Sequence, residues 1–230
     1  MNIYGLQKLT LLDYPKKVAC TVFTGGCNFR CPFCHNSSLI LCNEIGDAID
    51  EADFFSFLKK RVGILDGVCV SGGEPLLQPD IKLFLTKIKS MGFLIKLDTN
   101  GSFPERLKEL VQSGLVDYVA MDIKNSPERY AETIDVPNYD ISDVEKSVTF
   151  LLMNTVDYEF RTTVVRELHS AADFVSIGVW LKSASQYYLQ AFEDSPNVLK
   201  KGLSGYSKLE MEGFLKILYH DIPFAALRGI

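Results

Sequence analysis

The chain has 230 residues, of which 47% are hydrophobic and 23% are charged, a composition typical of a folded globular protein and not of a disordered one. The formal net charge of −5 argues against nucleic acid as the main partner. The first residues lack the basic start and long apolar core of a signal peptide, and residues 174–181, the most apolar late stretch, are too short to span a bilayer. We therefore expect a cytoplasmic protein without a membrane partner, in which cysteines remain reduced.

Short apolar runs alternate with amphipathic stretches along most of the chain. The expected strands, which are rich in Val, Ile, Phe and Tyr, are residues 18–23, 67–71, 93–98, 118–122, 158–165 and 187–192. The expected helices are residues 51–61, 79–91, 104–113, 142–153, 171–182 and 207–219. Pro79 and Gly92 mark the ends of the second helix, and Ser142 with Glu145 predicts a capping box at the start of the fourth.

Six strand–helix units in series predict an α/β fold with a parallel sheet and helices outside it. Six units are fewer than the eight that close a full barrel, so an open (β/α)6 partial barrel and a doubly wound sheet both fit. No repeat or linker-like change of composition divides the chain, and we expect a single domain over residues 1–230. Within it, residues 24–36 form a loop after the first strand and residues 220–230 a C-terminal extension.

Three cysteines, Cys27, Cys31 and Cys34, stand in one short run with the spacing Cys-x3-Cys-x2-Cys. No fourth cysteine completes the group. Zinc sites and closed iron–sulfur sites usually take four protein ligands. Three thiolates on a four-iron cluster leave one iron open, so the spacing predicts a cluster that binds another molecule.

The alternative is a zinc site that takes its fourth ligand from elsewhere in the chain, with Cys20, Cys42 or His35 as candidates. His35 directly follows Cys34, which makes ligation of the same metal awkward. Cys20 and Cys69 stand in apolar, strand-like runs, as expected of buried small hydrophobes. Cys42 is thus the remaining candidate for a fourth ligand, and we call it the reserve ligand.

Polar and glycine residues follow the carboxyl ends of the first four expected strands, in the segments 24–27, 71–75, 98–101 and 122–124. Parallel α/β folds place ligand sites at that edge, because the loops meet there. Gly72 and Gly73 let the backbone approach a bound molecule, and Glu74 is suited to accept hydrogen bonds from a ligand ammonium group. The alternative for this segment is a glycine-rich turn that enters a helix.

Two aspartates end neighbouring expected strands. We expect the carboxylates of Asp98 and Asp122 to face each other, with a cation, a lysine such as Lys124 or a ligand between them. The alternative is a pair of caps or turn residues. Arg161 stands in an otherwise apolar strand and needs an anionic partner, either a ligand carboxylate or an acid on an outer helix. Gln190 is a weaker candidate for contact with a base or ribose.

These motifs resemble those of radical S-adenosylmethionine (SAM) enzymes, and more closely those of the activases of glycyl radical enzymes. The resemblance is strongest to the activators of anaerobic ribonucleotide reductase. The cysteine spacing is typical of the superfamily, and the motifs after the third and fourth strands are typical of the activases. The segments that carry the resemblance are residues 4–8, 12–15, 25–27, 34–36, 71–75, 98–101, 121–124 and 227–230.

The resemblance implies an open partial barrel with one 4Fe–4S cluster on Cys27, Cys31 and Cys34, whose open iron binds the amino and carboxylate groups of SAM. It also implies a set of residues that contact SAM. These are Phe33, Cys34 and His35 at the adenine, Gly72, Gly73 and Glu74 at the amino group, Asp122, Lys124 and Arg161 around the carboxylate and ribose, and Asp98, Thr99, Asn100 and Gln190 nearby. A monovalent cation is implied at Asp98, Thr99 and Asp122.

The implied reaction is reductive cleavage of SAM to methionine and a 5′-deoxyadenosyl radical, which takes a hydrogen atom from a glycine of a partner protein. The expected partner is a glycyl radical enzyme, with anaerobic ribonucleotide reductase favoured and a flavodoxin or ferredoxin as electron donor. Two alternatives are a radical SAM enzyme acting on a small molecule and a metal-binding redox module without catalysis. The lack of an added substrate domain favours the protein substrate.

Two departures from the family limit the resemblance. Some activases carry further clusters in a cysteine-rich insertion, but residues 37–50 contain only Cys42, so we expect no auxiliary cluster. The last expected strand, 187–192, lacks the histidine that some relatives use there. The histidines that follow the cysteine loop, His169 and His220, are expected at the surface.

Overall fold

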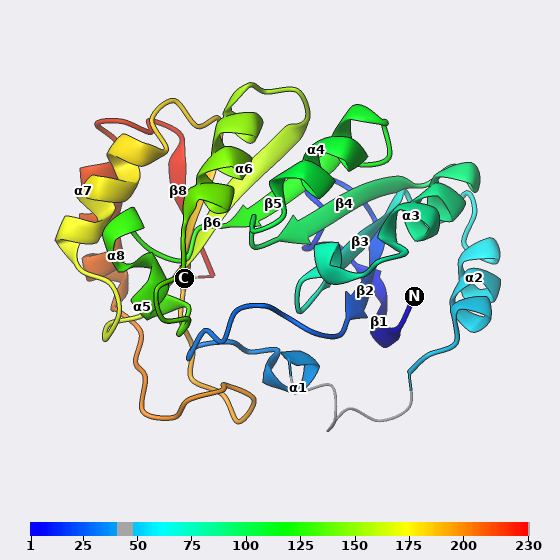
Figure 1. Cartoon of the computed structure of the whole chain (residues 1–230), viewed down its shortest axis with the longest axis horizontal. Helices are drawn as coiled ribbons and strands as arrows, with labels where there is room; N and C mark the ends of the chain where they lie inside the picture. The colour runs from blue at the N-terminus through cyan, green and yellow to red at the C-terminus, as the bar shows by residue number, and fades with distance from the viewer. Residues whose placement is uncertain (41–47, 230) are drawn as a thin grey trace. The chain divides into compact units, whose positions relative to one another are not determined.

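The structure is a computed structural model that describes residues 1–40 and 48–229 (Figure 1). Cys42 therefore lies outside the described residues. Contacts within the chain divide it into two units. The first unit holds residues 1–28, 38–99 and 105–119, and the second holds residues 29–37, 100–104 and 120–230. The expectation of a single domain stays a prediction.

Four strands in chain order form the sheet of the first unit. They are β1 (Ile3–Thr10), β2 (Ala19–Thr24), β3 (Gly67–Gly72) and β4 (Leu94–Thr99). β1 pairs antiparallel with β2, whereas β2, β3 and β4 run parallel. The register aligns Thr21, Cys69 and Lys96 in one row across the three parallel strands. Their carboxyl ends lie at one edge of this sheet, as predicted.

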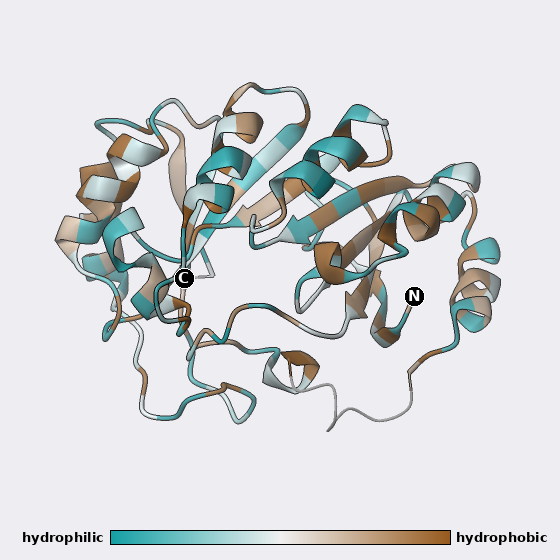
Figure 2. Ribbon diagram, viewed as in Figure 1, coloured by the Kyte–Doolittle hydropathy of each residue, from teal (hydrophilic) through white to brown (hydrophobic). Residues whose placement is uncertain are grey.

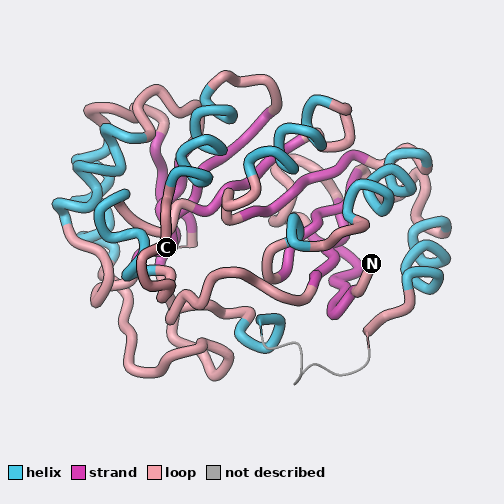
Figure 3. The backbone as a smooth tube through the Cα atoms, in the orientation of Figure 1, coloured by secondary structure: helices cyan, strands magenta, loops and turns pink. Residues whose placement is uncertain are grey.

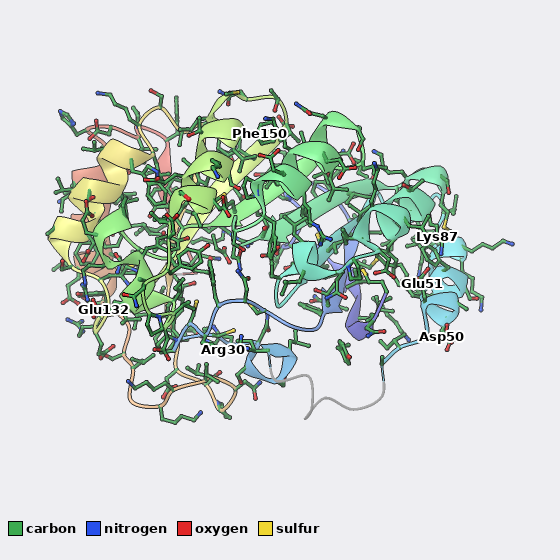
Figure 4. All side chains as sticks on the ribbon, viewed as in Figure 1. Arg30, Asp50, Glu51, Lys87, Glu132 and Phe150 are labelled. Atoms are coloured by element: carbon green, nitrogen blue, oxygen red, sulfur yellow. The ribbon has the colours of Figure 1, made fainter. Side chains whose placement is uncertain are left out.

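Amphipathic helices accompany these strands. They are α2 (Glu51–Lys59), the 3-10 turn η1 (Pro75–Leu77), α3 (Ile81–Ser90) and α4 (Pro104–Gln112). α3 buries residues at three- and four-residue spacing, namely Ile81, Phe84, Leu85 and Ile88. Lys87 of α3 donates to Glu51 of α2 across 2.6 Å, which ties the two helices together (Figure 4). α4 carries both hydrophilic and hydrophobic residues (Figure 2), and it buries Leu107, Leu110 and Val111 at three- and four-residue spacing.

Three parallel strands form the sheet of the second unit, β6 (Asp157–Val164), β7 (Tyr187–Ala191) and β8 (Ala225–Arg228). β5 (Tyr118–Asp122) begins in the first unit and ends in the second. The helical elements are η2 (Pro127–Arg129), α5 (Tyr130–Thr133), α6 (Ser142–Leu152), α7 (Ala171–Trp180) and α8 (Lys208–Leu218). α7 and α8 lie side by side, with the rings of Phe174 and Phe214 stacked at 4.6 Å (Figure 1).

One face of β6, β7 and β8 is polar. The register pairs Arg161 with Tyr188, and Gln190 with Arg228, so these side chains share a face. Glu159 of β6 is fully buried and accepts two hydrogen bonds from the Arg228 guanidinium, at 2.7 and 2.9 Å. That guanidinium also lies 3.8 Å over the Tyr188 ring. The last strand, which ends the sheet, thus supplies the cation that pairs with a buried carboxylate.

The structure confirms the six expected strands and six expected helices, with ends that differ by at most two residues. The sequence analysis missed β1, β8, α5 and the short α1 (Ser37–Ile40). Within the expected C-terminal extension, residues 225–228 form β8, which pairs with β7. No helix in the described part of the chain is long and apolar enough to cross a membrane.

The capping box predicted between Ser142 and Glu145 does not form. The Ser142 backbone N–H and hydroxyl both donate to the Asp140 carboxylate, at 2.9 and 3.0 Å. A charged acceptor two residues upstream outcompetes the serine cap. A capping box is present instead at α8, where Ser207 and Glu210 bond each other's backbone N–H groups.

Candidate functional site

The cysteines of the described residues differ sharply in environment, although none of them is in a disulfide. Cys20 and Cys69 are fully buried, and burial raises the pKa of each thiol to about 12. Both are the buried small hydrophobes that the sequence predicts, and neither is suited to bind metal as a thiolate. Cys27 and Cys34 are half-buried. The role of Cys42 as reserve ligand stays a prediction.

In the first unit, the loop that leads to the first cysteine is bonded to the loop after β3. The Gly73 N–H donates to the Thr24 carbonyl at 3.0 Å, and the Glu74 N–H donates to the Gly26 carbonyl at 2.8 Å. A Cβ atom on Gly73 would lie 1.9 Å from the Gly26 oxygen, and one on Gly72 would lie 2.3 Å from Thr24 backbone atoms. The two glycines are therefore required by the packing of one loop on the other.

The Glu74 side chain is fully buried at this edge of the first sheet. Its Oε1 atom accepts from the Leu76 N–H at 3.0 Å and from the Thr99 hydroxyl at 2.9 Å. The carboxylate therefore caps η1 and joins the end of β3 to the end of β4. This bracing role was not identified from the sequence, because it depends on contacts between distant residues.

Asp98, at the end of β4, is paired inside the first unit. The Lys96 ammonium, two residues earlier on the same strand, forms an ion pair with one carboxylate oxygen. The Ser71 hydroxyl donates to the other at 3.0 Å. The partner of the Asp98 carboxylate is thus Lys96, which the sequence analysis did not name. The expected approach of Asp98 to Asp122 stays a prediction, because Asp122 belongs to the second unit.

In the second unit, backbone contacts anchor the segment that carries the other two cysteines. Cys31 is buried, and its carbonyl accepts from the Cys34 N–H at 3.1 Å in a tight turn. The Leu199 N–H donates to the Cys34 carbonyl at 3.2 Å, and the Lys200 N–H donates to the Pro32 carbonyl at 2.8 Å. Both segments are loops (Figure 3). No residue pattern signals these contacts, since only main-chain atoms make them.

The aromatic residues of the cysteine segment pack on the protein itself. The His35 ring stacks on Phe192 at 5.5 Å, and its Nε2 atom is hydrogen-bonded to the Glu193 carbonyl at 2.7 Å. Phe33 is buried with its ring 6.5 Å from that of His169. Both side chains hold the cysteine segment in place, and their expected contact with an adenine stays a prediction.

Asp122, Lys124 and Arg161 form one charged group in the second unit. Lys124 Nζ and Arg161 Nε each lie 3.0 Å from a different oxygen of Asp122. Burial opposes ionisation of Asp122, but the two cations outweigh it and lower the pKa of this carboxyl to about 2. Lys124 is therefore the partner that the sequence predicted. Arg161 pairs with Asp122 at the end of β5, and not with a helix acid, in the ion pair that the structure describes.

Lys124 also acts electrostatically on the cysteine segment. Burial raises the pKa of the Cys34 thiol, and the positive charge of Lys124 opposes that rise. Cys31 also interacts with the charge of Lys124. After burial and the charge of Asp122, this interaction is the next largest influence on the pKa of Lys124, which it raises. The Asp122 carboxylate adds to the rise at Cys34, and the pKa of Cys34 stays above its usual value. Lys124 therefore offsets only part of the cost of forming a thiolate at this cysteine.

His169 is buried, so the expectation that it lies at the surface was wrong. Its Nδ1 atom lies 3.1 Å from the Val165 N–H, and its Nε2 atom lies 2.9 Å from the Lys124 carbonyl. These contacts fit a neutral ring that accepts at Nδ1 and donates at Nε2. Burial lowers the pKa of this histidine. His220 is 84% exposed, as predicted.

We expect the free energy of unfolding to fall as the pH drops below about 6.5, the pKa of a histidine in an unfolded chain. The unfolded chain then binds a proton that buried His169 binds only at lower pH, so stability is present above that pH and lost below it. The slope reaches at most about 1.4 kcal/mol per pH unit. Urea unfolding of wild type and His169→Gln between about pH 5 and 7 measures it.

The His169→Gln variant should lose this slope, whereas His220→Gln, which changes an exposed ring, should keep it. An equal slope in wild type and His169→Gln would assign the pH dependence to other groups.

Two further residues of the predicted site, Asn100 and Gln190, lie in a turn and on β7. The Asn100 side chain accepts from the Ser102 N–H at 3.0 Å and closes a turn. Within that turn Gly101 has a φ of +78°, and a Cβ there would collide with Met121. Gln190 is half-buried on β7. Contacts of Asn100 and Gln190 with a cofactor stay predictions.

The donor set fits an iron–sulfur cluster better than a zinc ion. Among the described residues no three His, Cys, Asp or Glu side chains form a group that could hold one metal ion. A 4Fe–4S cluster makes a different demand, because each cysteine binds its own iron. Three cysteines within eight residues, none of them in a disulfide, supply three such ligands. Cys31 and Cys34 in addition interact with the positive charge of Lys124.

Comparison with known proteins gives concordant matches. A family model described as the radical SAM superfamily matches residues 21–168. A candidate glycyl-radical enzyme activating enzyme of Methanocaldococcus jannaschii is 34% identical over 197 residues, which cover 83% of this chain and 80% of that protein. The pyruvate formate-lyase-activating enzyme of Listeria monocytogenes is 32% identical over 159 residues, covering 62% of this chain and 61% of that enzyme. Streptococcus suis SuiB, solved with SAM, aligns with a TM-score of 0.69 and 14% identity over 90% of this chain and 49% of its own.

The mainly parallel strands, the helices between them and the cysteine loop at the strand ends define an α/β iron–sulfur enzyme. The likeness to SuiB supports the open, partial-barrel fold predicted from the sequence. Because the family model spans more than half of the chain, this protein belongs to the radical SAM superfamily. Membership implies a 4Fe–4S cluster and SAM as cofactors, and it excludes the non-catalytic redox module. The predicted resemblance to glycyl radical enzyme activases is confirmed by the two relatives.

Proposed function

We propose that this protein activates a glycyl radical enzyme by removing a hydrogen atom from one of its glycines. The similarity to the M. jannaschii relative, 34% identity over 83% of the chain, carries the proposal. The Listeria enzyme, an activase of pyruvate formate-lyase by its name, supports the same reaction class. Anaerobic ribonucleotide reductase is the proposed partner because the motifs resemble those of its activators.

The cysteine loop would hold the cluster through Cys27, Cys31 and Cys34. When bound and reduced, the cluster supplies one electron to the sulfonium of SAM, which yields methionine and a 5′-deoxyadenosyl radical for hydrogen abstraction. The chain's own residues fix the ligands and tune their charge. The positive charge of Lys124 opposes the rise that burial causes in the pKa of Cys34, and the backbone bonds from residues 199 and 200 hold the cysteine segment.

We infer that the SAM carboxylate and ribose lie at Arg161 and Lys124, because these two cations share a single carboxylate, Asp122. The ammonium group would bind backbone carbonyl groups of residues 72–74. Glu74 acts there indirectly, since its buried side chain braces the loop from within. The adenine would lie against the backbone of residues 33–35, with Asn100 and Gln190 as further contacts.

The remaining proposals concern groups outside the chain. We propose a flavodoxin or ferredoxin as the electron donor and the cytoplasm as the compartment. The monovalent cation implied at Asp98, Thr99 and Asp122 is not part of this proposal, because each of the two carboxylates already has a cation from the protein. The Thr99 hydroxyl, moreover, donates to Glu74.

Isotope transfer separates a protein substrate from a small molecule. The reconstituted protein is incubated anaerobically with SAM, a reductant and a candidate partner that carries α-deuterated glycine. Mass spectrometry of the 5′-deoxyadenosine should show one deuterium, since the radical takes the glycine α-hydrogen. Formation of 5′-deoxyadenosine without deuterium in the presence of every candidate would favour the small-molecule alternative.

A further inference from the structure

Lys96 is buried inside the first unit, next to Asp98, a residue of the candidate site. The Lys96 side chain is 2% exposed, and its ammonium forms an ion pair with Asp98, whose side chain is 19% exposed. The two residues are two positions apart on β4, so both side chains lie on the same face of the strand. The charge of Lys96 is therefore presented to Asp98 from the interior of the protein.

The side chains in register with Lys96 on β3 and β2 carry no charge. Its register partner on β3 is Cys69, whose pKa burial raises to about 12, so this neighbour remains a neutral thiol. The next residue in the row, Thr21, donates to Asp13 at 2.5 Å. A buried ammonium needs such polar neighbours and an anionic partner, because an unpaired charge in this position is costly.

The same carboxylate is where the resemblance implies a monovalent cation. An ammonium group and a potassium ion both carry one positive charge and are satisfied by carboxylate and hydroxyl oxygens. Asp98 already receives an ammonium from Lys96 and a hydroxyl from Ser71. The other implied ligands are engaged as well, Thr99 with Glu74 and Asp122 with Lys124. The donor set therefore does not fit an additional cation.

We propose that the Lys96 ammonium takes the place of the monovalent cation at Asp98, so that this protein folds and cleaves SAM without bound potassium or sodium. Lys96 is then a positioning residue: it acts on the site through Asp98 and touches no substrate. The ion pair is observed independently of the proposed function, but its effect on SAM cleavage rests on that function.

A first test needs neither cluster nor SAM. The melting temperature of the apoprotein is measured in KCl, NaCl and tetramethylammonium chloride at constant ionic strength, because the last cation is too large for the site. Wild type should show the same value in all three salts. Lys96→Met should melt roughly 6–20 °C lower, since Asp98 loses its buried partner. Potassium or sodium, but not tetramethylammonium, should restore part of the loss.

Two further variants make this test specific. Lys82→Met removes a lysine whose side chain is 55% exposed, so its melting temperature should respond equally to all three salts. In the double variant Lys96→Met/Asp98→Asn the potassium response should disappear. If Lys96→Met fails to fold, Lys96→Arg, which keeps the charge, should fold and show no cation response. A potassium-dependent melting temperature in wild type or in Lys96→Arg would overturn the proposal.

The second test uses the reconstituted enzyme. Wild type should form 5′-deoxyadenosine at the same rate in potassium and tetramethylammonium salts, whereas Lys96→Met should be active only with potassium or sodium. A loss of wild-type cleavage without small cations would contradict the inference. Absence of 5′-deoxyadenosine from all variants with an intact cluster would instead refute the proposed function, and the melting data would still decide the role of Lys96.

Discussion

Replacing Cys31 with alanine is expected to remove both the iron–sulfur cluster and the reductive cleavage of SAM. The side chain is buried in the backbone-anchored segment, close enough to Lys124 for the two groups to interact electrostatically. With two cysteines left in the loop, two irons of the cluster lack a protein ligand. Iron and sulfide content after anaerobic reconstitution, together with 5′-deoxyadenosine formation, measures both losses.

Cys20→Ala is the matched control, because it also removes a buried thiol. Cys20 is fully buried with a pKa raised to about 12, so we expect it to take no part in binding the cluster. We expect this variant to lose about 1 kcal/mol of stability and to keep its full iron content. Wild-type iron content and cleavage in Cys31→Ala would refute the assignment of the cysteine loop.

Gly73→Ala is expected to destabilise the protein by more than about 3 kcal/mol, the upper end for one added methyl group. The new Cβ would lie 1.9 Å from the Gly26 oxygen, a backbone atom that cannot rotate away. Relief requires breaking the bond between the Glu74 N–H and that same oxygen. Because Cys27 directly follows Gly26, the iron content should fall as well. Urea unfolding and iron analysis test both effects.

Gly213→Ala provides the control for adding a methyl group. Gly213 lies within α8, and a Cβ there meets no atom within 4 Å. The change should be neutral or stabilising by roughly 0.5–1 kcal/mol, since alanine favours the helix. Unchanged stability and iron content in Gly73→Ala would show that the two loops separate without cost.

The hydrophobic pattern predicted the parallel strands and the helices between them, but not the outer strands. β1 exposes Gln7, Lys8 and Leu9 in succession, so it has no alternating pattern to detect. β8 has four residues, of which only Ala225 is buried. Such strands are defined by their pairing with a neighbour and not by their own composition.

The sequence likewise predicted one part of the candidate site and not the other. Cysteine spacing and the segments after the strands located Cys31, Asp122 and Lys124, because these residues stand in local motifs. The burial of His169 and the pairing of Lys96 with Asp98 were missed. A histidine in a loop gives no local sign of burial. A lysine in a strand shows its role only when the neighbouring strands are known.

The most direct test of the proposed function is electron paramagnetic resonance of the reconstituted protein, mixed anaerobically with SAM, reductant and candidate glycyl radical enzymes. We predict a glycyl doublet with one candidate, because the α-hydrogen that remains on the glycine radical splits the signal. The splitting should collapse when the partner carries α-deuterated glycine, and the signal should be absent with Cys31→Ala. A reduced cluster that forms 5′-deoxyadenosine but gives no glycyl doublet with any candidate would contradict the proposal.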